Sequence, residues 1–237
     1  MKNFWLTLEA GYYDKILING LKKKRGLQAG WHHITFTNIK NQIKNNTKHL
    51  DYACGPGTLV GTYLNCISYG VDMSINQIEY AKKNYKKKGQ FFTPDEFRFE
   101  NYEKYFDYIT VIGLIEFIDK EELINLIKEL KKMLNEKGEI YFTTPNFTIG
   151  MKIMILVQRV FSRVSYSSVF KTEYTKSKLE DLLSKNYVKN YEITKIQNLG
   201  FLFSYFSLNL GVKISNLISK FTFNRTGFLL LLRISND

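Results

Sequence analysis

The stretch LDYACGPGT, residues 50–58, decides how the chain folds. A short apolar run, HLDYACG, ends in a turn signal, and residues 58–68 then have the pattern of a helix. Gly55 and Gly57 lie where this strand passes into the helix, so the backbone can turn tightly and approach a ligand closely. The free N–H groups at the start of the helix suit an anionic part of that ligand. The stretch therefore predicts a strand, a ligand-binding turn and a helix.

The alternation of strand and helix continues downstream. Strands are expected at SYGVDMS, at residues 97–100, in FDYITVIG and in EIYFTTPN, and helices over residues 75–88 and 121–134. Strands that alternate with helices at this spacing form a parallel, doubly wound sheet. The predicted fold class is therefore α/β, with a mostly parallel sheet and helices on both faces.

The flanking segments differ from this central region. Residues 1–46 have a helical pattern with a break at RGLQAGWHH, and we interpret them as an N-terminal helical cap on a main domain of residues 47–237. Two apolar segments, at 147–170 and 199–220, are expected to act as lids. A helix over 176–185 and two final strands, in VKNYEITKI and GFLLLLRI, complete the chain. The charge-free run from Ile196 to Val212 is shorter than the roughly 18 to 20 apolar residues of a membrane span.

Composition limits the class of protein. A hydrophobic content of 44% with 24% charged residues is typical of a globular protein and excludes a disordered or fibrous chain. Two cysteines provide no disulfide framework, which indicates a reducing compartment. The start, MKNFWLTLEAGYYDK, has charges too early for a signal peptide. A cytoplasmic location is expected.

The net charge of +12 is unevenly distributed. Residues 1–49 hold 9 basic and 2 acidic side chains, residues 50–146 hold 12 and 15, and residues 147–237 hold 13 and 5. Of the 34 cations 28 are Lys, whereas nucleic-acid recognition favours the planar Arg fork. Nucleic acid is therefore the disfavoured partner. An anionic membrane surface, an anionic substrate, or no charged partner at all remain as alternatives.

A carboxylate completes the glycine turn. Asp72 stands 15 residues after Gly57, at the end of the next expected strand. A carboxylate at that position can accept hydrogen bonds from both hydroxyls of a ribose. The turn and the carboxylate together predict a nucleoside-binding site. Dehydrogenases usually have G-x-G-x-x-G, but here the residue three after Gly57 is Val60, which disfavours NAD.

These motifs resemble those of the class I S-adenosylmethionine-dependent methyltransferases. LDYACGPG matches the glycine-rich first motif of the family, and YGVDMS with the following AKK matches its second motif. FDYITVIGLIEFI matches the next strand and loop, and EIYFTTPN matches the fifth strand. The resemblance covers residues 48–146 well and the last two strands loosely. It implies a seven-stranded Rossmann-like sheet with S-adenosylmethionine as the cofactor and no metal ion.

The resemblance also implies roles for individual residues. The loop of residues 55–57 would hold the methionine part of the cofactor and Asp72 its ribose, while Met73 would pack on the adenine. Ala53 stands where the family most often has its first glycine, so its methyl group is expected to crowd the cofactor. The full expected set of cofactor contacts is Asp51, Ala53, Cys54, Gly55, Gly57, Asp72, Met73, and Glu100 or Asn101 near the adenine edge.

Three side chains are candidates for catalysis. A general base is needed only when the methyl acceptor arrives protonated, and histidine suits that role near neutral pH. His32 and His33 occur in the predicted cap, where catalytic and structural roles both remain open. Glu116, in GLIEF, follows the fourth expected strand at the edge where substrates bind. The alternative for Glu116 is a solvated loop carboxylate or a charge at a helix N-terminus.

The expected reaction is methyl transfer to an oxygen, and less favourably to a nitrogen or carbon, of a small-molecule or lipid-linked acceptor. Enzymes that methylate base amino groups resemble one another in an Asp/Asn-Pro-Pro-aromatic motif, and GLIEF replaces it here. The alternatives are a non-catalytic cofactor-binding scaffold that docks a partner or membrane, and an RNA methyltransferase.

Cations beside the apolar segments suggest a further contact. Together with neighbouring Lys and Arg residues, the apolar segments at 147–170 and 199–220 are expected to form a basic, amphipathic surface. Such a surface is suited to anionic lipid at the inner face of a membrane. The oligomeric state is left open by the sequence. The cations are Lys152, Arg159, Arg163, Lys213 and Lys220.

Overall fold

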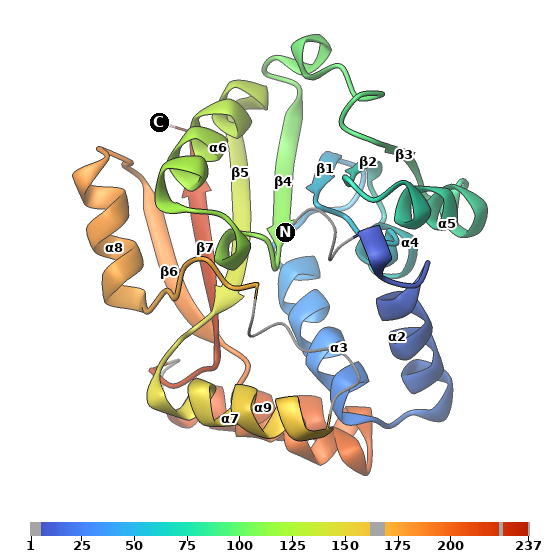
Figure 1. The fold of residues 1–237 in the computed structure, drawn as a ribbon, viewed down its shortest axis with the longest axis vertical. Coiled ribbons are helices and arrows are strands. Elements are labelled where there is room, and N and C mark those ends of the chain that lie inside the picture. The colour runs from blue at the N-terminus through green and yellow to red at the C-terminus, as the bar shows by residue number, and fades with distance from the viewer. Residues whose placement is uncertain (1–5, 162–168, 223–224, 237) are drawn as a thin grey trace.

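The computed structural model describes residues 6–161, 169–222 and 225–236, which fold as a central sheet with helices on both faces (Figure 1). The strands are β1 (Lys48–Tyr52), β2 (Ile67–Val71), β3 (Gly89–Phe92), β4 (Phe106–Ile112), β5 (Leu134–Pro145), β6 (Tyr191–Ile196) and β7 (Leu229–Ser235). The α-helices are α2 (Tyr12–Lys23), α3 (Leu27–Lys40), α4 (Thr58–Thr62), α5 (Ile75–Tyr85), α6 (Lys120–Met133), α7 (Ile149–Phe161), α8 (Lys176–Lys185) and α9 (Leu208–Phe221). Short 3-10 helices are η1 (Phe99–Tyr102), η2 (Ile115–Phe117) and η3 (Leu199–Tyr205).

The sheet has seven strands in the order β3-β2-β1-β4-β5-β7-β6. The strands β3, β2, β1, β4 and β5 run parallel, and β7 is antiparallel to both β5 and β6. The chain therefore winds outward from β1 in one direction and from β4 in the other. This order confirms the predicted doubly wound, mostly parallel sheet.

The point where the winding direction reverses positions the site. Asp51 on β1 pairs with Gly70 of β2 on one side and with Thr110 of β4 on the other. The segments that follow β1 and β4 leave in opposite directions, and in doubly wound sheets the ligand-binding crevice lies at this point, outside the carboxyl ends of the strands.

Alternate residues of the strands pack into two separate cores. On one face, Phe142 and its neighbours pack with Leu123, Ile127 and Leu130 of α6 and with Leu179 of α8. On the other face, Tyr141 and Tyr108 pack with Ile39 of α3 and Leu59 of α4. Strands buried on both faces explain the nearly continuous apolar runs of the sequence.

The N-terminal segment is helical, as expected, and docks on the main domain. The chain turns between α2 and α3 at Lys24, which has a φ of 56°. The break predicted at RGLQAGWHH is therefore shorter than expected, and His32 and His33 lie inside α3. Asp14 of α2 accepts hydrogen bonds from the hydroxyls of Tyr80 (2.8 Å) and Tyr85 (2.6 Å) of α5. The division of the chain at residue 46 stays a prediction.

Two sequence predictions for this half of the sheet are wrong in detail. The helix expected over 58–68 ends at Thr62, because the chain must turn back to enter β2 at Ile67. The third strand is Gly89–Phe92, whereas residues 97–100 leave the sheet and enter η1. The cause is aromatic packing, since Phe97 stacks on Tyr102 with ring centroids 4.6 Å apart. Alternating aromatic residues here fill a core pocket instead of a strand.

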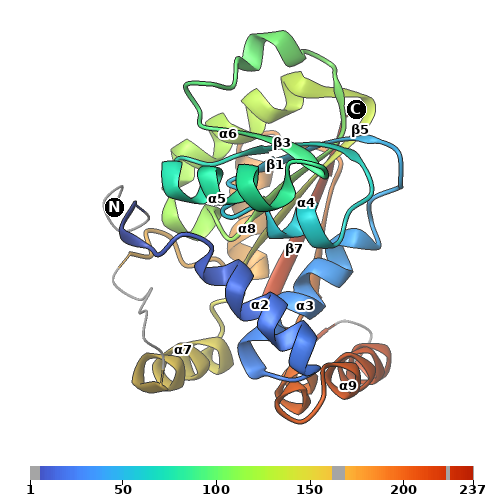
Figure 2. The ribbon, with the colours of Figure 1, turned by 90° about the vertical axis from the view of Figure 1, so that its right-hand side faces the viewer.

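Helices α7 and α9 both lie across the carboxyl end of the sheet, at the lower end of the molecule in Figures 1 and 2. Helix α7 begins four residues after β5, and η3 with α9 follows β6, whose carboxyl end is at the same edge. No helix in the described ranges is long and apolar enough to cross a bilayer.

Candidate functional site

The loop after β1 is built from backbone conformations that favour glycine. Gly55 and Gly57 have φ values of 51° and 74°, and Ala53 has a φ of 63°. A Cβ on Gly57 would lie 2.6 Å from the ring of Phe91, so that position requires glycine for space as well. Ala53 carries a methyl group in the left-handed region, at a cost of roughly 1 kcal/mol. The structure thus explains why a glycine is the usual residue there.

Gly55 faces open space. No heavy atom lies within 4 Å of the point where a Cβ on Gly55 would stand. The residues around it are packed, since Cys54, Pro56 and Gly57 are buried. Burial also raises the pKa of the Cys54 thiol well above its usual range, so this thiol stays protonated. The backbone at Gly55 is therefore free to approach a ligand.

Asp72 fastens this loop to the end of β2. Its carboxylate accepts a hydrogen bond from the N–H of Gly55 at one oxygen and from the N–H of Ser74 at the other, both at 2.8 Å. Burial raises the pKa of Asp72, and these two backbone bonds oppose the rise. Each carboxylate oxygen has capacity for a further bond. Asp72 can therefore hold the loop and still accept from a ligand hydroxyl.

A second carboxylate lies deeper in the crevice. Asp51 is buried, and its Oδ1 accepts a 2.7 Å hydrogen bond from the hydroxyl of Thr110. The same hydroxyl lies 2.9 Å from Nε2 of His49, whose Nδ1 is 3.3 Å from the hydroxyl of Ser68. Burial raises the pKa of Asp51 to about 7, the Thr110 bond opposes the rise, and the charge of Asp72 adds to it. Burial lowers the pKa of His49 to about 3, which leaves its ring neutral inside the sheet.

Glu116 lies on η2, just after β4, and is 4% exposed. Burial raises the pKa of this carboxyl to about 7. Its Oε2 has no hydrogen-bond partner among the described residues, and the same holds for the buried hydroxyl of Tyr174. The sequence-based alternative of a solvated loop carboxylate is thus wrong. A buried carboxyl that titrates near neutrality is instead suited to general acid or base chemistry.

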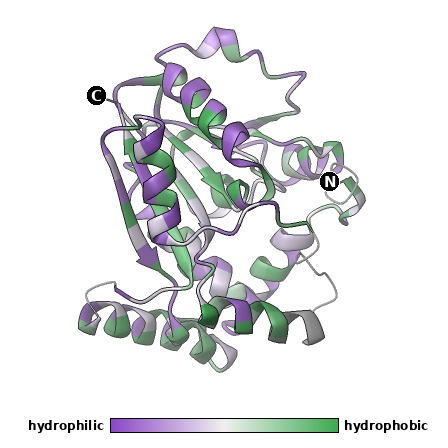
Figure 3. Ribbon diagram, turned by 60° about the vertical axis from the view of Figure 1, so that its left-hand side comes forward, coloured by the Kyte–Doolittle hydropathy of each residue, from purple (hydrophilic) through white to green (hydrophobic). Residues whose placement is uncertain are grey.

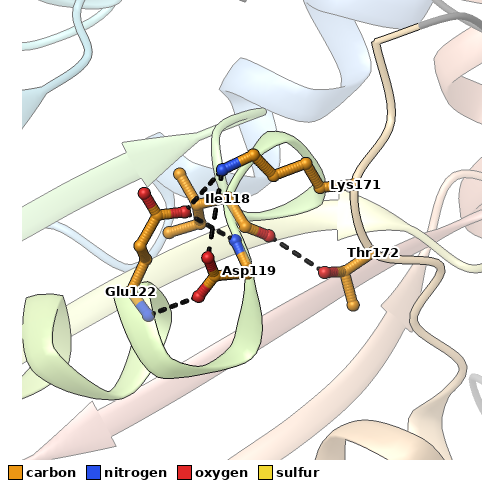
Figure 4. Close-up of polar contacts among 5 residues, drawn as sticks. All are labelled: Ile118, Asp119, Glu122, Lys171 and Thr172. Carbon is orange, nitrogen blue, oxygen red and sulfur yellow. Dashed lines mark hydrogen bonds and ion pairs between the residues drawn. The ribbon is translucent and has the colours of Figure 1, made fainter.

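The segment that covers Glu116 comes from far along the chain. The backbone N–H groups of Lys171 (2.9 Å) and Thr172 (3.2 Å) both donate to the carbonyl oxygen of Glu116. Figure 4 shows how the side chains of these two residues fasten the segment to the start of α6. Lys171 Nζ lies 2.9 Å from a carboxylate oxygen of Glu122, and the Thr172 hydroxyl donates to the carbonyl of Ile118 at 2.9 Å.

The anchor point on α6 is itself a capping box. Asp119 accepts from the N–H of Glu122, and Glu122 accepts from the N–H of Asp119, both at 2.8 Å. The spacing Asp119-x-x-Glu122 before an apolar run is a sequence signal that could have located this helix start. No such local signal points to Lys171 or Thr172.

The two histidines of α3 lie in aromatic surroundings. The ring of His32 is 5.6 Å from that of Tyr13, and burial lowers the pKa of His32 to about 4. Nδ1 of His33 is 2.7 Å from the hydroxyl of Tyr63, which follows α4, and burial lowers the pKa of His33 as well. Both rings are positioned by the cap and α4. Their catalytic role stays a prediction.

The expected adenine-side residues are at the surface. Met73, directly after β2, is 38% exposed, and Glu100 and Asn101 are exposed on η1. Their contacts with a cofactor stay predictions. The structure brings together Asp51, the 53–57 loop and Asp72. Among the described residues no cluster of three His, Cys, Asp or Glu could hold a metal ion.

Comparison with known proteins bears on this crevice. Residues 50–138 match a family described as a methyltransferase domain. These residues include the glycine loop, Asp72 and Glu116. This part of the chain is therefore similar to methyltransferase domains. This match agrees with the predicted methyltransferase family.

Solved structures of methyltransferases share the fold over most of the chain. Magnesium protoporphyrin IX methyltransferase from Synechocystis PCC 6803, with bound S-adenosylhomocysteine, has a TM-score of 0.57 at 13% identity and covers 89% of this chain and 85% of its own. A S-adenosylmethionine-dependent methyltransferase from Archaeoglobus fulgidus has a TM-score of 0.58 at 16% identity, with 86% and 94% covered.

A sequence relative is an uncharacterized protein of Rickettsia prowazekii (strain Madrid E). It is 31% identical over 150 residues, which are 58% of this chain and 57% of the relative. The match thus spans little more than half the length of that protein.

The residues of this domain fit the predicted cofactor. S-adenosylmethionine carries ribose hydroxyls, an ammonium group and a sulfonium cation. The open backbone at Gly55 and the free acceptor capacity of Asp72 suit the first two groups. The charge of the half-buried Asp72 raises the pKa of the buried Asp51, and the negative potential of these carboxyl groups favours a cationic ligand nearby.

Proposed function

We propose that this protein transfers the methyl group of S-adenosylmethionine to an oxygen of a small-molecule or lipid-linked acceptor. The observation that supports oxygen as the acceptor atom is the buried Glu116 carboxyl at the carboxyl end of β4. Its pKa of about 7 matches the demand on a base that takes a proton from a hydroxyl at neutral pH. An amine that arrives deprotonated would need no such group.

The bound cofactor supplies an electrophilic methyl group on its sulfonium. The task of the chain is to hold both reactants in line and keep water out. The loop at Gly55 and the carboxylate of Asp72 would bind and orient the cofactor. The segment fastened by Lys171 and Thr172 excludes water from Glu116. Glu116 would then accept the proton that the acceptor hydroxyl loses.

His32 and His33 are the competing candidates for the base. Both are neutral at pH 7, because burial lowers their pKa values. A neutral imidazole can accept a proton, but a pKa of about 4 makes His32 a weak base. Glu116 is therefore our preferred base, and a hydrogen-bonding role with Tyr63 is preferred for His33.

Calorimetric titration with S-adenosylhomocysteine, with NAD as the control ligand, tests the cofactor. Binding of the first and not the second is expected. A panel of hydroxyl and amine acceptors then tests the reaction, with E116Q compared with H33N. We expect E116Q to lower turnover at least a hundredfold with little change in cofactor affinity, and H33N to lower it less than tenfold. A larger loss of turnover in H33N than in E116Q would indicate that the base is a histidine of α3.

A protein that binds S-adenosylhomocysteine but methylates no acceptor in such a panel would favour the scaffold alternative. The expected place of the reaction is the inner face of a membrane. That proposal depends on the surface described next.

A further inference from the structure

Four consecutive cationic residues contact an aromatic segment near the edge of the sheet where the parallel strands end. Residues 22–25, Lys-Lys-Lys-Arg, are exposed at the end of α2 and in the turn that follows it. The carbonyl of Lys24 accepts a 2.8 Å hydrogen bond from the N–H of Leu208, and the N–H of Gly26 donates to the carbonyl of Ser204 at 2.7 Å. These bonds place the cations directly beside η3 and the start of α9.

The segment that they contact exposes large apolar side chains. Phe206 is 70% exposed and Phe221 is 76% exposed. Single exposed apolar residues are ordinary, but eight of them on two successive elements, η3 and α9, and the residue between them indicate an interaction site. The exposed members are Leu199, Leu202, Phe203, Tyr205, Phe206, Leu210, Leu217 and Phe221.

The inner side of the hairpin formed by η3 and α9 is held by hydrogen bonds around Asn198. Buried Asn198 donates to the carbonyl of Ser215 (2.9 Å) and to the hydroxyl of Ser219 (3.0 Å). Its side-chain oxygen accepts from the N–H of Gly200 and the hydroxyl of Ser215. The apolar residues therefore point outward from an ordered hairpin. Their exposure does not result from loose packing.

Helix α7 adds a second apolar stripe at the same end of the molecule. Ile149, Ile153 and Leu156 are exposed at a spacing of four and three residues, which places them on one side of the helix. Figures 1 and 2 show α7 and α9 as two helices lying across this end, and Figure 3 shows hydrophobic residues recurring along helices there.

The charges of the 22–25 run, η3 and α9 have one sign. Residues 15–50 and 193–236 contain no Asp or Glu. Lys213 and Lys220 of α9 add to the cations of the 22–25 run, and none of these has an ion-pair partner in the part of the chain that the structure describes. Lys152 of α7 is paired with Glu173 at 2.5 Å. Arg159 and Arg163 lie outside the described side chains.

We propose that the 22–25 run, η3, α9 and the exposed stripe of α7 form a docking surface for an anionic phospholipid bilayer. Lysines attract anionic headgroups, while Phe and Tyr side chains suit the headgroup and acyl boundary. A second copy of the chain fits this face less well, because a symmetric pairing would bring two cationic runs together. The surface lies at the carboxyl edge of the sheet, so it deepens the proposed function by delivering a lipid-borne acceptor to the crevice.

Co-sedimentation of the full chain with vesicles tests the surface without any use of methyl transfer. We expect binding to vesicles of 70% phosphatidylcholine and 30% phosphatidylglycerol at low salt, and at least tenfold weaker binding to pure phosphatidylcholine. F203S/F206S should weaken binding at least tenfold on the anionic vesicles. K22Q/K23Q/K24Q should do the same, since each lysine near the surface contributes roughly fivefold.

Matched controls exist elsewhere on the chain. K86Q/K87Q/K88Q removes the same charge from the exposed run after α5, and Y187S removes an 87% exposed aromatic residue from the turn after α8. Both should bind as wild type does. In F206W, tryptophan emission should shift to the blue on vesicles and be quenched by brominated acyl chains. Unchanged melting temperatures would exclude misfolding as the cause of weaker binding.

Several results would overturn the docking surface. One is the absence of vesicle binding at any salt, and another is an equal loss of vesicle binding in the control variants. A third is a wild-type dimer that does not bind vesicles and that F203S/F206S converts to a monomer. Binding of S-adenosylhomocysteine is measured separately. A protein that binds the cofactor but not vesicles therefore contradicts only the surface, and one that binds vesicles but not the cofactor contradicts only the proposed function.

Discussion

The N–H of Gly55 donates a 2.8 Å hydrogen bond to Oδ2 of Asp72. This bond joins the loop after β1 to the end of β2, two segments that are adjacent in the sheet. The same carboxylate therefore shapes the glycine loop and, in our proposal, also binds the cofactor. Loss of that carboxylate should therefore affect the loop and the binding of the cofactor together.

For D72N we expect at least a tenfold loss of affinity for S-adenosylhomocysteine in calorimetric titration. An amide has one acceptor oxygen in place of two, so it cannot serve Gly55, Ser74 and a ribose hydroxyl at once. D95N changes an exposed carboxylate in the loop after β3 and should leave the affinity as it is. Equal affinities in D72N and wild type would remove Asp72 from the cofactor site.

The strain at Ala53 predicts a stabilising substitution. A53G places the residue that tolerates a φ of 63° at that position, so the free energy of unfolding should rise by about 1 kcal/mol, partly offset by the greater entropy of the unfolded chain. A81G, inside α5, is the contrasting control and should lower the free energy of unfolding by more than about 1 kcal/mol. Urea titration measures both. A lower stability of A53G would show that the left-handed conformation there costs little.

Glu116 should make stability depend on pH. Its folded pKa of about 7 lies above its ordinary value of 4.5, so the unfolded chain loses this proton at a lower pH than the native protein does. The native state is therefore destabilised as the pH rises from about 4.5 to 7, by up to about 3 kcal/mol. Below that window the carboxyl causes no penalty, and above it the penalty is complete.

E116Q cannot ionise, so its melting temperature should exceed that of wild type at pH 8 by several degrees, and the difference should shrink at pH 5. E121Q, at an exposed position on α6, is the control and should show no such pH-dependent difference. A constant difference between E116Q and wild type from pH 5 to 8 would indicate that Glu116 titrates outside this window.

The segment of Lys171 and Thr172 should influence the pKa of the Glu116 carboxyl. K171M breaks the ion pair with Glu122, and T172V removes the bond to Ile118, which contributes about 1 kcal/mol. Water should then reach Glu116 and lower its pKa, so the rising limb of the pH profile of kcat/KM should move to lower pH. K185M, which breaks the exposed pair with Asp181, should leave that limb in place. An unmoved limb in both K171M and T172V would show that the segment does not control the carboxyl.

Local features of the sequence were enough to predict the sheet and the cofactor loop. Gly55, Gly57 and Asp72 could be placed together because parallel neighbouring strands bring their carboxyl ends to one edge. The strand predicted at residues 97–100 was wrong because alternating apolar residues have the same pattern in a strand and in an aromatic pocket. Only the packing of Phe97 on Tyr102 distinguishes the two.

The sequence by itself thus determined the doubly wound sheet and the glycine turn after its first strand, since turn chemistry and apolar periodicity act over a few residues. Only the tertiary structure revealed the burial of Glu116, whose carbonyl accepts hydrogen bonds from Lys171 and Thr172, more than fifty residues away. The tertiary structure likewise joined the 22–25 cations to η3, across about 180 residues of chain. Burial and surface charge arise from such distant contacts, which local patterns do not specify.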